Sequence, residues 1–474
     1  MNAYKILFTQ ISLITLFGWP THAHAELTLK DYINQVKTQN QGYRATQIAQ
    51  DGFWYRESEG SIDFMPSLIG GASYSDDKKQ QSSPLYGTQT ISQNAYLGVQ
   101  TKLRTGTNLS LTYNTTYAQV NGSTSIPSAG NYSNAPQISI SQPLWKDFNA
   151  ELSKAFEETT VLSLKAQALL QKFSSHQIIY SAETAYWRLA LLRQVVNFDK
   201  DSIERTNKIL KWNQKRVSMN VTDRADLLQA QAALKARELQ FQTDEESLRQ
   251  AASLFNSARG VRGDHVPEVL TPIEVGIEKM AASEVKRLAD RADVTANVLN
   301  AQVQKAQAKL AAEKVKPDVS LYGTAAFNGR DSNQRIATQQ SWKSDYPTYT
   351  VGVKLTVPLG LGITSDIKEG YNASAQAAEN ASWRARFELD QDWSDLQKRF
   401  KDALTRLETA RDLETLQSEK LEYERKRFGN GRTTSYQVLQ FEDHFSDARL
   451  IRIRIINDII SLRALSRLYN GESL

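Results

Sequence analysis

The chain has 474 residues, a net charge of +5 and no cysteine. Hydrophobic residues make up 40% of it and charged residues 23%, which is ordinary for a packed protein and excludes a polar disordered chain. Lys and Arg alternate with acidic residues along the helical stretches, which indicates solvated helix faces and argues against a nucleic-acid interface. Without cysteine we expect neither disulfides nor a lipid anchor.

Residues 1–25 have the composition of a signal peptide. Lys5 precedes an apolar run from Ile6 to Trp19, and small residues at Ala23 and Ala25 suit cleavage before Glu26. After Glu26 no run of about 18 apolar residues follows, so the sequence predicts an exported protein without a transmembrane helix. If this protein lies in a membrane, it must use strands.

The next region predicts a helix over 27–64, ended by Pro66, and then four strands. From Ser67 the sequence pattern changes from helical spacing to a period of two, with Leu68, Gly70, Ala72 and Tyr74 on one face. The strand runs are about nine to eleven residues long and are linked by one short and two long connections, which is typical of outer-membrane barrels. They are Ser67–Tyr74, Ala95–Leu103, Asn108–Tyr117 and Pro136–Leu144.

A very long helical hairpin follows these strands. No Gly or Pro occurs between Leu144 and Arg259, which predicts a rod over Glu151–Ser218 about 100 Å long. We expect the chain to turn at 219–222, with Thr222 as the N-cap and Asp223 in the first turn of the returning helix.

The second half of the chain repeats this order. Two strand runs, Asp318–Phe327 and Tyr349–Val357, are joined by a polar loop over 328–347. A helical hairpin at about 366–470 follows and is interrupted at Gly429-Asn430-Gly431. Its turn region, Arg427 to Gln440, matches Arg216 to Gln229 at an offset of 211 residues. We therefore expect a first repeat over 26–258, a linker over 259–283 and a second repeat over 284–474.

Aromatic residues gather near the ends of the strand runs. They could form a girdle at the two lipid interfaces, and the alternative is ordinary exposed loop aromatics. The residues are Tyr74, Tyr96, Tyr113, Tyr117, Trp145, Trp342, Tyr346 and Tyr349.

In their order and duplication, several motifs resemble the TolC-like outer-membrane efflux family over essentially the whole mature chain. They are Leu27-Thr28-Leu29, Pro66-Ser67-Leu68, Gln142-Pro143-Leu144, Asp290–Val294, Pro317–Leu321 and Arg427–Leu439. The resemblance implies a mainly α protein with membrane β structure, whose homotrimer forms a β-barrel continued by a periplasmic α-helical barrel. It implies a passive exit duct for efflux or type I secretion, without a cofactor, in the outer membrane and extending into the periplasm.

The same resemblance implies partners and site residues. A periplasmic adaptor and an inner-membrane pump or ABC exporter would dock at the helical tips, and outer-membrane lipid would surround the barrel. A constriction is expected at Gln437 and Gln440, where relatives often carry an aspartate pair, together with Asp226. Nearby acids, Glu442 and Asp443 or Asp223 and Asp226, are the alternative source of negative charge there. The tip residues are Asn220, Val221, Thr222, Asp223, Gly429, Asn430, Gly431, Arg432, Thr433, Thr434 and Ser435.

Other interpretations are less well supported by the sequence. His176, His265 and His444 are isolated and form no catalytic or metal-binding pattern, so no enzyme is predicted. A barrel-anchored coiled-coil structural protein or adhesin stays open as the alternative. Family members have two strands per half whereas the first half here has four, so a trimeric barrel would have 12 strands or 18.

Overall fold

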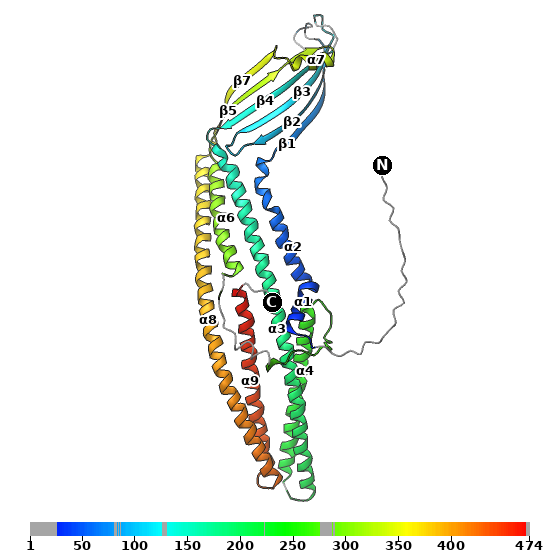
Figure 1. Cartoon of the computed structure of the whole chain (residues 1–474), viewed down its shortest axis with the longest axis vertical. Coiled ribbons are helices and arrows are strands. Elements are labelled where there is room, and N and C mark those ends of the chain that lie inside the picture. The colour runs from blue at the N-terminus through cyan, green and yellow to red at the C-terminus, as the bar shows by residue number, and fades with distance from the viewer. Residues whose placement is uncertain are drawn as a thin grey trace, which may run out of the picture.

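The computed structural model describes residues 26–79, 83, 85, 87–125, 130–221, 223–274, 287 and 290–470. The predicted signal peptide and part of the predicted linker lie outside these residues. The molecule is elongated, with a single sheet at one end and long helices that run away from it (Figure 1).

The N-terminal region forms three helical segments, so the prediction of one helix over 27–64 was wrong. They are α1 (Leu29–Gln39), α2 (Gln41–Tyr55) and the 3-10 helix η1 (Arg56–Phe64). The break is at Asn40, which has extended φ and ψ angles and caps α2 by accepting a hydrogen bond from the Tyr43 N–H at 2.8 Å. Its amide also donates to the Ala258 carbonyl, and a side chain that bonds the backbone in this way competes with a continuous helix.

The sheet has six long strands on one continuous path, in the order β1-β2-β3-β4-β5-β7, and all neighbouring pairs are antiparallel. Every expected strand run falls within one of them, apart from a few terminal residues. The first and last strands of this order, β1 and β7, form the two edges of the sheet. The strands are β1 (Ser67–Asp77), β2 (Gln89–Lys102), β3 (Asn108–Asn121), β4 (Asn131–Pro143), β5 (Asp318–Phe327) and β7 (Pro347–Thr356).

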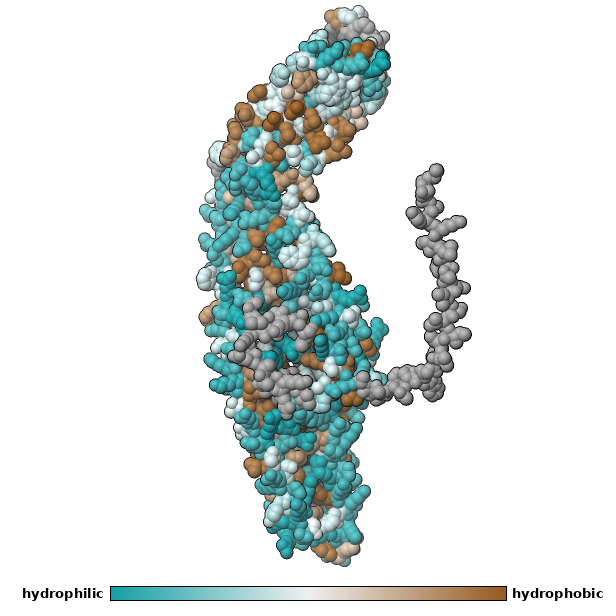
Figure 2. All heavy atoms as spheres, viewed as in Figure 1, coloured by the Kyte–Doolittle hydropathy of each residue, from teal (hydrophilic) through white to brown (hydrophobic). Residues whose placement is uncertain are grey.

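The register gives the sheet one apolar and one polar face, because directly paired residues share a face. A row across the six strands consists of Leu68, Val99, Leu111, Ile138, Ala325 and Tyr349. The next row, on the opposite face, consists of Ser67, Gln100, Ser110, Ser139, Thr324 and Thr350. Figure 2 shows hydrophobic side chains gathered over the sheet, with hydrophilic ones above and below them.

Tyr96 does not fit the proposed aromatic girdle. It pairs with Gly71 and Asn114 and therefore lies on the polar face, where its ring covers Gly71. Tyr74, Tyr113 and Tyr349 lie on the apolar face by the same register.

The connection between β5 and β7 is not the polar loop that the sequence predicted. It contains a short strand β6 (Gly329–Asp331), which pairs with β4, and a helix α7 (Gln334–Ser341). A Cβ atom at Gly329 would lie 2.0 Å from the Ala337 carbonyl oxygen, so only glycine allows this close packing of α7 on the strand.

The long helices form a layer below the sheet. The rod α3 spans Glu151–Ser218, as predicted, and α4 (Arg224–Ala258) returns along it. α6 (Ala292–Lys314) leads up to β5, and α8 (Leu361–Gly429) and α9 (Ser435–Asn470) form the second hairpin. Directly under the sheet the neighbours are α2, α3, α6 and α8 in that order, and towards the far end they are α4, α3, α9 and α8 (Figure 1).

A tight turn joins the sheet to α3 and includes three non-glycine residues with positive φ angles, Asp147, Asn149 and Ala150. The Asp147 carboxylate holds this turn by accepting hydrogen bonds from the Leu152 and Ser153 N–H groups at 3.0 and 3.2 Å and by pairing with Lys102 of β2. Charge-assisted bonds of this kind offset local backbone strain. They fix the angle at which the sheet meets the rod.

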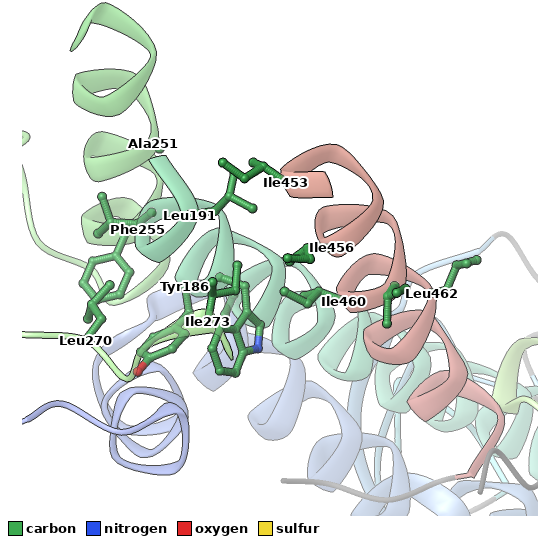
Figure 3. Close-up of a cluster of buried hydrophobic side chains, with 14 of the residues drawn as sticks. Tyr186, Leu191, Ala251, Phe255, Leu270, Ile273, Ile453, Ile456, Ile460 and Leu462 are labelled. Atoms are coloured by element: carbon green, nitrogen blue, oxygen red, sulfur yellow. The ribbon is translucent and has the colours of Figure 1, made fainter. Parts of the chain in front are cut away.

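The largest apolar core lies halfway along the helical layer, where α1, α3, α4 and α9 meet (Figure 3). Tyr186 is fully buried at its centre: its hydroxyl donates to the Leu27 carbonyl at 2.6 Å and accepts from the Thr271 N–H at 2.9 Å. The Tyr32 ring stacks on Phe255 with 4.2 Å between centroids. This core fastens the N-terminal segment and the segment after α4 onto the rod.

Replacing Tyr186 with Phe should lower the free energy of unfolding of this region by ~1–3 kcal/mol, because both main-chain partners of the hydroxyl would lose their bond inside the core. Hydrogen exchange of the Thr271 amide and thermal unfolding followed by circular dichroism would measure the effect. Tyr55→Phe is the matched control, since Tyr55 is 84% exposed. Equal stability of the two variants would contradict this account.

Candidate functional site

The two helical turns at the far end of the molecule have the same geometry. After α3, Asn220 has a φ of 54°, its N–H donates to the Val217 carbonyl, and the Val221 N–H donates to the Arg216 carbonyl. After α8, Gly431 has a φ of 70° and its N–H donates to the Phe428 carbonyl. The Arg432 N–H donates to the Arg427 carbonyl, as Val221 does to Arg216 in the first turn. Both are Schellman turns, which favour Asn or Gly at the left-handed position. The offset of 211 residues found in the sequence is therefore also an offset between equivalent structures.

The returning helices are capped by Asp223 and Thr434, which are equivalent at the same offset. Asp223 is the N-cap of α4 and its carboxylate accepts from the Ala225 N–H at 3.3 Å, so the prediction that it lies inside the first turn was wrong. Thr222, predicted as the cap, lies outside the described residues. The Thr434 hydroxyl accepts from the Gln437 N–H at 3.3 Å. An oxygen in this position satisfies an amide that the helix leaves unpaired.

A small apolar core directly behind the turns joins the two hairpins. The ring centroids of Trp212 in α3 and Phe428 in α8 are 3.9 Å apart. The guanidinium carbon of Arg216 lies 4.4 Å from the Trp212 ring centroid. Val438 and Leu439 of α9 are buried in this core. The two turns are therefore supported by one common core.

The predicted constriction residues line no closed site within one chain. Gln437 and Gln440 are exposed and lie one turn apart on α9, while Asp226 is half-buried and its carbonyl accepts from the Asn213 amide. The Arg432 carbonyl accepts from the Arg427 guanidinium at 3.2 Å, which ties this residue to its own turn. A constriction at these positions would require a second copy of the chain to face the exposed stripe.

Glu442 cannot supply the negative charge that the sequence analysis considered for the constriction. Its side chain is 1% exposed and lies between two guanidinium groups, Arg205 of α3 at 3.3 Å and Arg425 of α8. Burial lowers the pKa of both arginines, and the buried carboxylate neutralises part of their charge. Glu442 is thus a structural charge that connects three helices.

Two further pairs of charged residues were missed by the sequence analysis. Asp443 of α9 pairs with Arg237 of α4, and Glu414 of α8 pairs with Arg452 of α9. Each pair joins two different helices, so spacing within one helix cannot reveal it. Glu442 did leave a signal, since it falls on the buried stripe of α9 that contains Val438, Ser446 and Ile453.

A pair of acidic residues lies between the two helices of the first hairpin. Burial, followed by the hydrogen bond and the charge of the neighbouring Asp244 carboxyl group, raises the pKa of Asp199 to about 7, and Arg237 opposes the shift. Asp199 is only 8% exposed. Asp199 therefore takes up a proton at a higher pH than an isolated aspartate would.

Within the described part of the chain, no group of three or more His, Cys, Asp or Glu residues could hold a metal ion. None of the described helices is both long and apolar enough to cross a membrane.

Comparisons with known proteins identify the fold. No protein-family model and no curated protein matches the chain. Among solved structures it is similar to the outer membrane protein VceC of Vibrio cholerae, with a TM-score of 0.65 and 16% identity over 94% of this chain and 97% of that one. The outer-membrane channel OprN gives a TM-score of 0.66 at 15% identity over 92% and 89% of the two chains.

The open state of the Neisseria gonorrhoeae outer membrane channel MtrE also matches, with a TM-score of 0.66 at 15% identity over 94% of this chain and 89% of that one. Likenesses at these identities establish a shared fold over nearly the whole chain. The resemblance to the TolC-like family is confirmed at that level.

Replacing Glu442 with Gln should destabilise the tips by ~1–3 kcal/mol, because the partly buried guanidinium groups of Arg205 and Arg425 would lose the carboxylate that lies between them. The opening free energy from hydrogen exchange of amides in α8 and α9 would measure this loss. Glu422→Gln is the matched control, since Glu422 is 68% exposed in its i,i+4 pair with Lys426 and should cost below ~1 kcal/mol. An effect no larger than that of the control would show that the buried carboxylate is dispensable.

The Asp199 pair predicts that the first hairpin loses stability as pH rises. Because the pKa of Asp199 is raised in the folded state, from 3.8 to about 7, the folded state binds more protons between these values, and stability declines across that window by as much as ~4 kcal/mol. Hydrogen exchange of α3 and α4 between pH 4 and pH 8 should show this slope, and Asp199→Asn should remove it. The exposed neighbour Asp201→Asn should retain the slope; a slope that survives in Asp199→Asn would refute the assignment.

Proposed function

We propose that this chain is one subunit of a passive exit duct in the outer membrane, serving a tripartite efflux or type I secretion system. The observation that carries the proposal is a sheet with one apolar face, one polar face and two open edges, placed at the end of a helical layer. Lipid would contact the apolar face and water the polar one, as in a membrane barrel.

Closure of the barrel requires several copies of the chain. Barrels of a single chain have at least about eight strands, and six cannot enclose a pore. Joining β7 of one copy to β1 of the next would pair both edges. We propose a homotrimer on the resemblance to the TolC-like family, and the outer-membrane channels that share the fold are consistent with it.

The long hairpins would continue the pore across the periplasm. The rod α3 has 68 residues, about 100 Å of helix, and it ends at the paired turns. We propose that the signal over 1–25 directs export, that the repeats are 26–258 and 284–474 with a linker over 259–283, and that a periplasmic adaptor and an inner-membrane pump or ABC exporter act at the turns. The docking residues would be Asn220 to Asp223 and Gly429 to Ser435.

The exposed stripe of α9 would face the centre of the closed end. Gln437 and Gln440 would place amides there, and amides form hydrogen bonds without contributing charge. Asp226 would be contributed by the other hairpin. Opening by a docked adaptor would separate these side chains between neighbouring subunits. Cation selection at such a ring would be weak.

A single cysteine at Gln440 tests this proposal in a chain that has no other cysteine. In planar bilayers containing Gln440→Cys, a bulky methanethiosulfonate reagent should lower the single-channel conductance, because it would add volume at the narrowest point. Gln440→Ser and the parent protein, treated identically, should not respond. A protein that forms no oligomer by native mass and fractionates away from the outer membrane would refute the duct. A protein that resides in the outer membrane but conducts in no bilayer would favour the barrel-anchored adhesin or structural role.

A further inference from the structure

A cavity of about 810 Å³ lies where the sheet meets the helical layer, at the lower ends of β5 and β7 and between α3, α6 and α8. We call it the junction cavity. Its volume is within the range of sites that bind small molecules, about 300–1,000 Å³. Its lining is largely apolar and includes Phe156, Leu310, Val315, Val357, Ile367 and Tyr371.

The junction cavity borders the polar face of the sheet. Asp318 and Thr356 line it and pair directly with each other, an even number of residues from Thr324 of the polar row. Asp318 and Lys146 also border a second hollow, whose other strand residues all belong to the polar face. In the proposed duct this face meets the water of the pore, so the inference below rests on that proposal.

The junction cavity has a surplus of positive charge. Among the described residues that line it, Lys146, Lys314 and Lys316 are cationic, and Asp318 is the only acid. Lys316 is neutralised by Glu313, which lies next to the cavity. No described carboxylate forms an ion pair with the half-buried Lys146 or with Lys314. Two cations therefore face one carboxylate on an otherwise apolar surface.

We propose that the junction cavity binds amphiphilic organic anions that reach it from the pore. Such a molecule has an apolar body and one carboxylate, sulfonate or phosphate group. The apolar body would remove water from Phe156 and Ile367, which are 42% and 37% exposed. The anionic group would form charge-assisted bonds with the two lysines that lack a partner carboxylate. Each chain carries a whole site, because the lining residues come from one chain.

A single cysteine reports occupancy of the site in a chain that has no other cysteine. Ile367→Cys places a thiol in the lining, and Ser139→Cys places one on the polar face of the sheet outside the cavity. In outer-membrane vesicles both should react with N-ethylmaleimide. Saturating pyrene-1-sulfonate should slow the reaction of Ile367→Cys by about tenfold, because a bound molecule is largely enclosed by its site. The rate for Ser139→Cys should not change.

Two further comparisons test the preference for anions. Pyren-1-ylmethylammonium has the same rings with a cationic group, and half-protection of Ile367→Cys should need at least about tenfold more of it than of the sulfonate. Adding Lys146→Gln and Lys314→Gln should raise the half-protecting concentration of the sulfonate by about tenfold, as expected for the loss of a charge-assisted bond. Lys309→Gln is the matched control, since Lys309 lies on the opposite face of α6 from Lys314 and pairs with Glu158.

The remaining outcomes separate the site from the duct. Equal protection by the two pyrene compounds would overturn the preference for anions. Unprotected Ile367→Cys in an intact oligomer, with Ser139→Cys still reactive, would overturn the site and leave the duct standing. A thiol at Ile367→Cys that reacts only after delipidation would show that a membrane lipid fills the cavity, which overturns binding from the pore. If the lysine variant fails to assemble, the two pyrene compounds on Ile367→Cys alone decide. A monomer by native mass, found away from the outer membrane, would overturn the proposed duct itself.

Discussion

The open edges of the sheet are the constraint on which the rest of the structure depends. β1 and β7 each present a row of backbone N–H and C=O groups that no strand among the described residues pairs. In hydrocarbon each unpaired group costs several kcal/mol, and an edge in water invites uncontrolled association. In the proposed duct, membrane insertion and edge pairing would therefore occur together. The register that separates Leu111 from Ser110 would then decide which side of the assembly is wet.

The helical layer is held together differently at its middle and at its end. At the middle, aromatic rings and aliphatic side chains such as Tyr186 and Ile456 form a conventional core, and this core is where apolar burial contributes most. Towards the turns the layer thins, and buried charges such as Glu442 join α3, α8 and α9. Ion pairs of this kind add little net stability compared with apolar contacts, but they tolerate few alternative arrangements. In the proposed duct, a tunnel end that closes in a defined state and also opens would be well served by contacts that specify geometry without adding much stability.

The parts of the fold that the sequence predicted are those that depend on local physics. The absence of Gly and Pro predicted the long continuous helix α3, and the period of two assigned Leu68 and Ser67 to opposite faces. Errors arose where a distant partner decides the outcome. Asn40 breaks a helix partly because the Ala258 carbonyl lies within reach of its amide, and α7 forms where Gly329 lets a helix approach the strand. Glu442 was misassigned because its partners come from two other helices.

The duplication conserves backbone geometry more strictly than chemistry. At the offset of 211 residues, Asn220 and Gly431 occupy the same left-handed position, and Asp223 and Thr434 perform the same capping. Both substitutions keep what the turn requires, a residue that accepts a positive φ and an oxygen that accepts an amide bond. Charge is not kept, since Asp223 and Asp226 correspond to Thr434 and Gln437. The two hairpins therefore present equivalent shapes with unequal charge, with the exposed Asp223 on one tip and the exposed Arg432 on the other. In the proposed ring of subunits, tips of unlike charge would alternate, and a docking partner would distinguish one hairpin from the other by electrostatics alone.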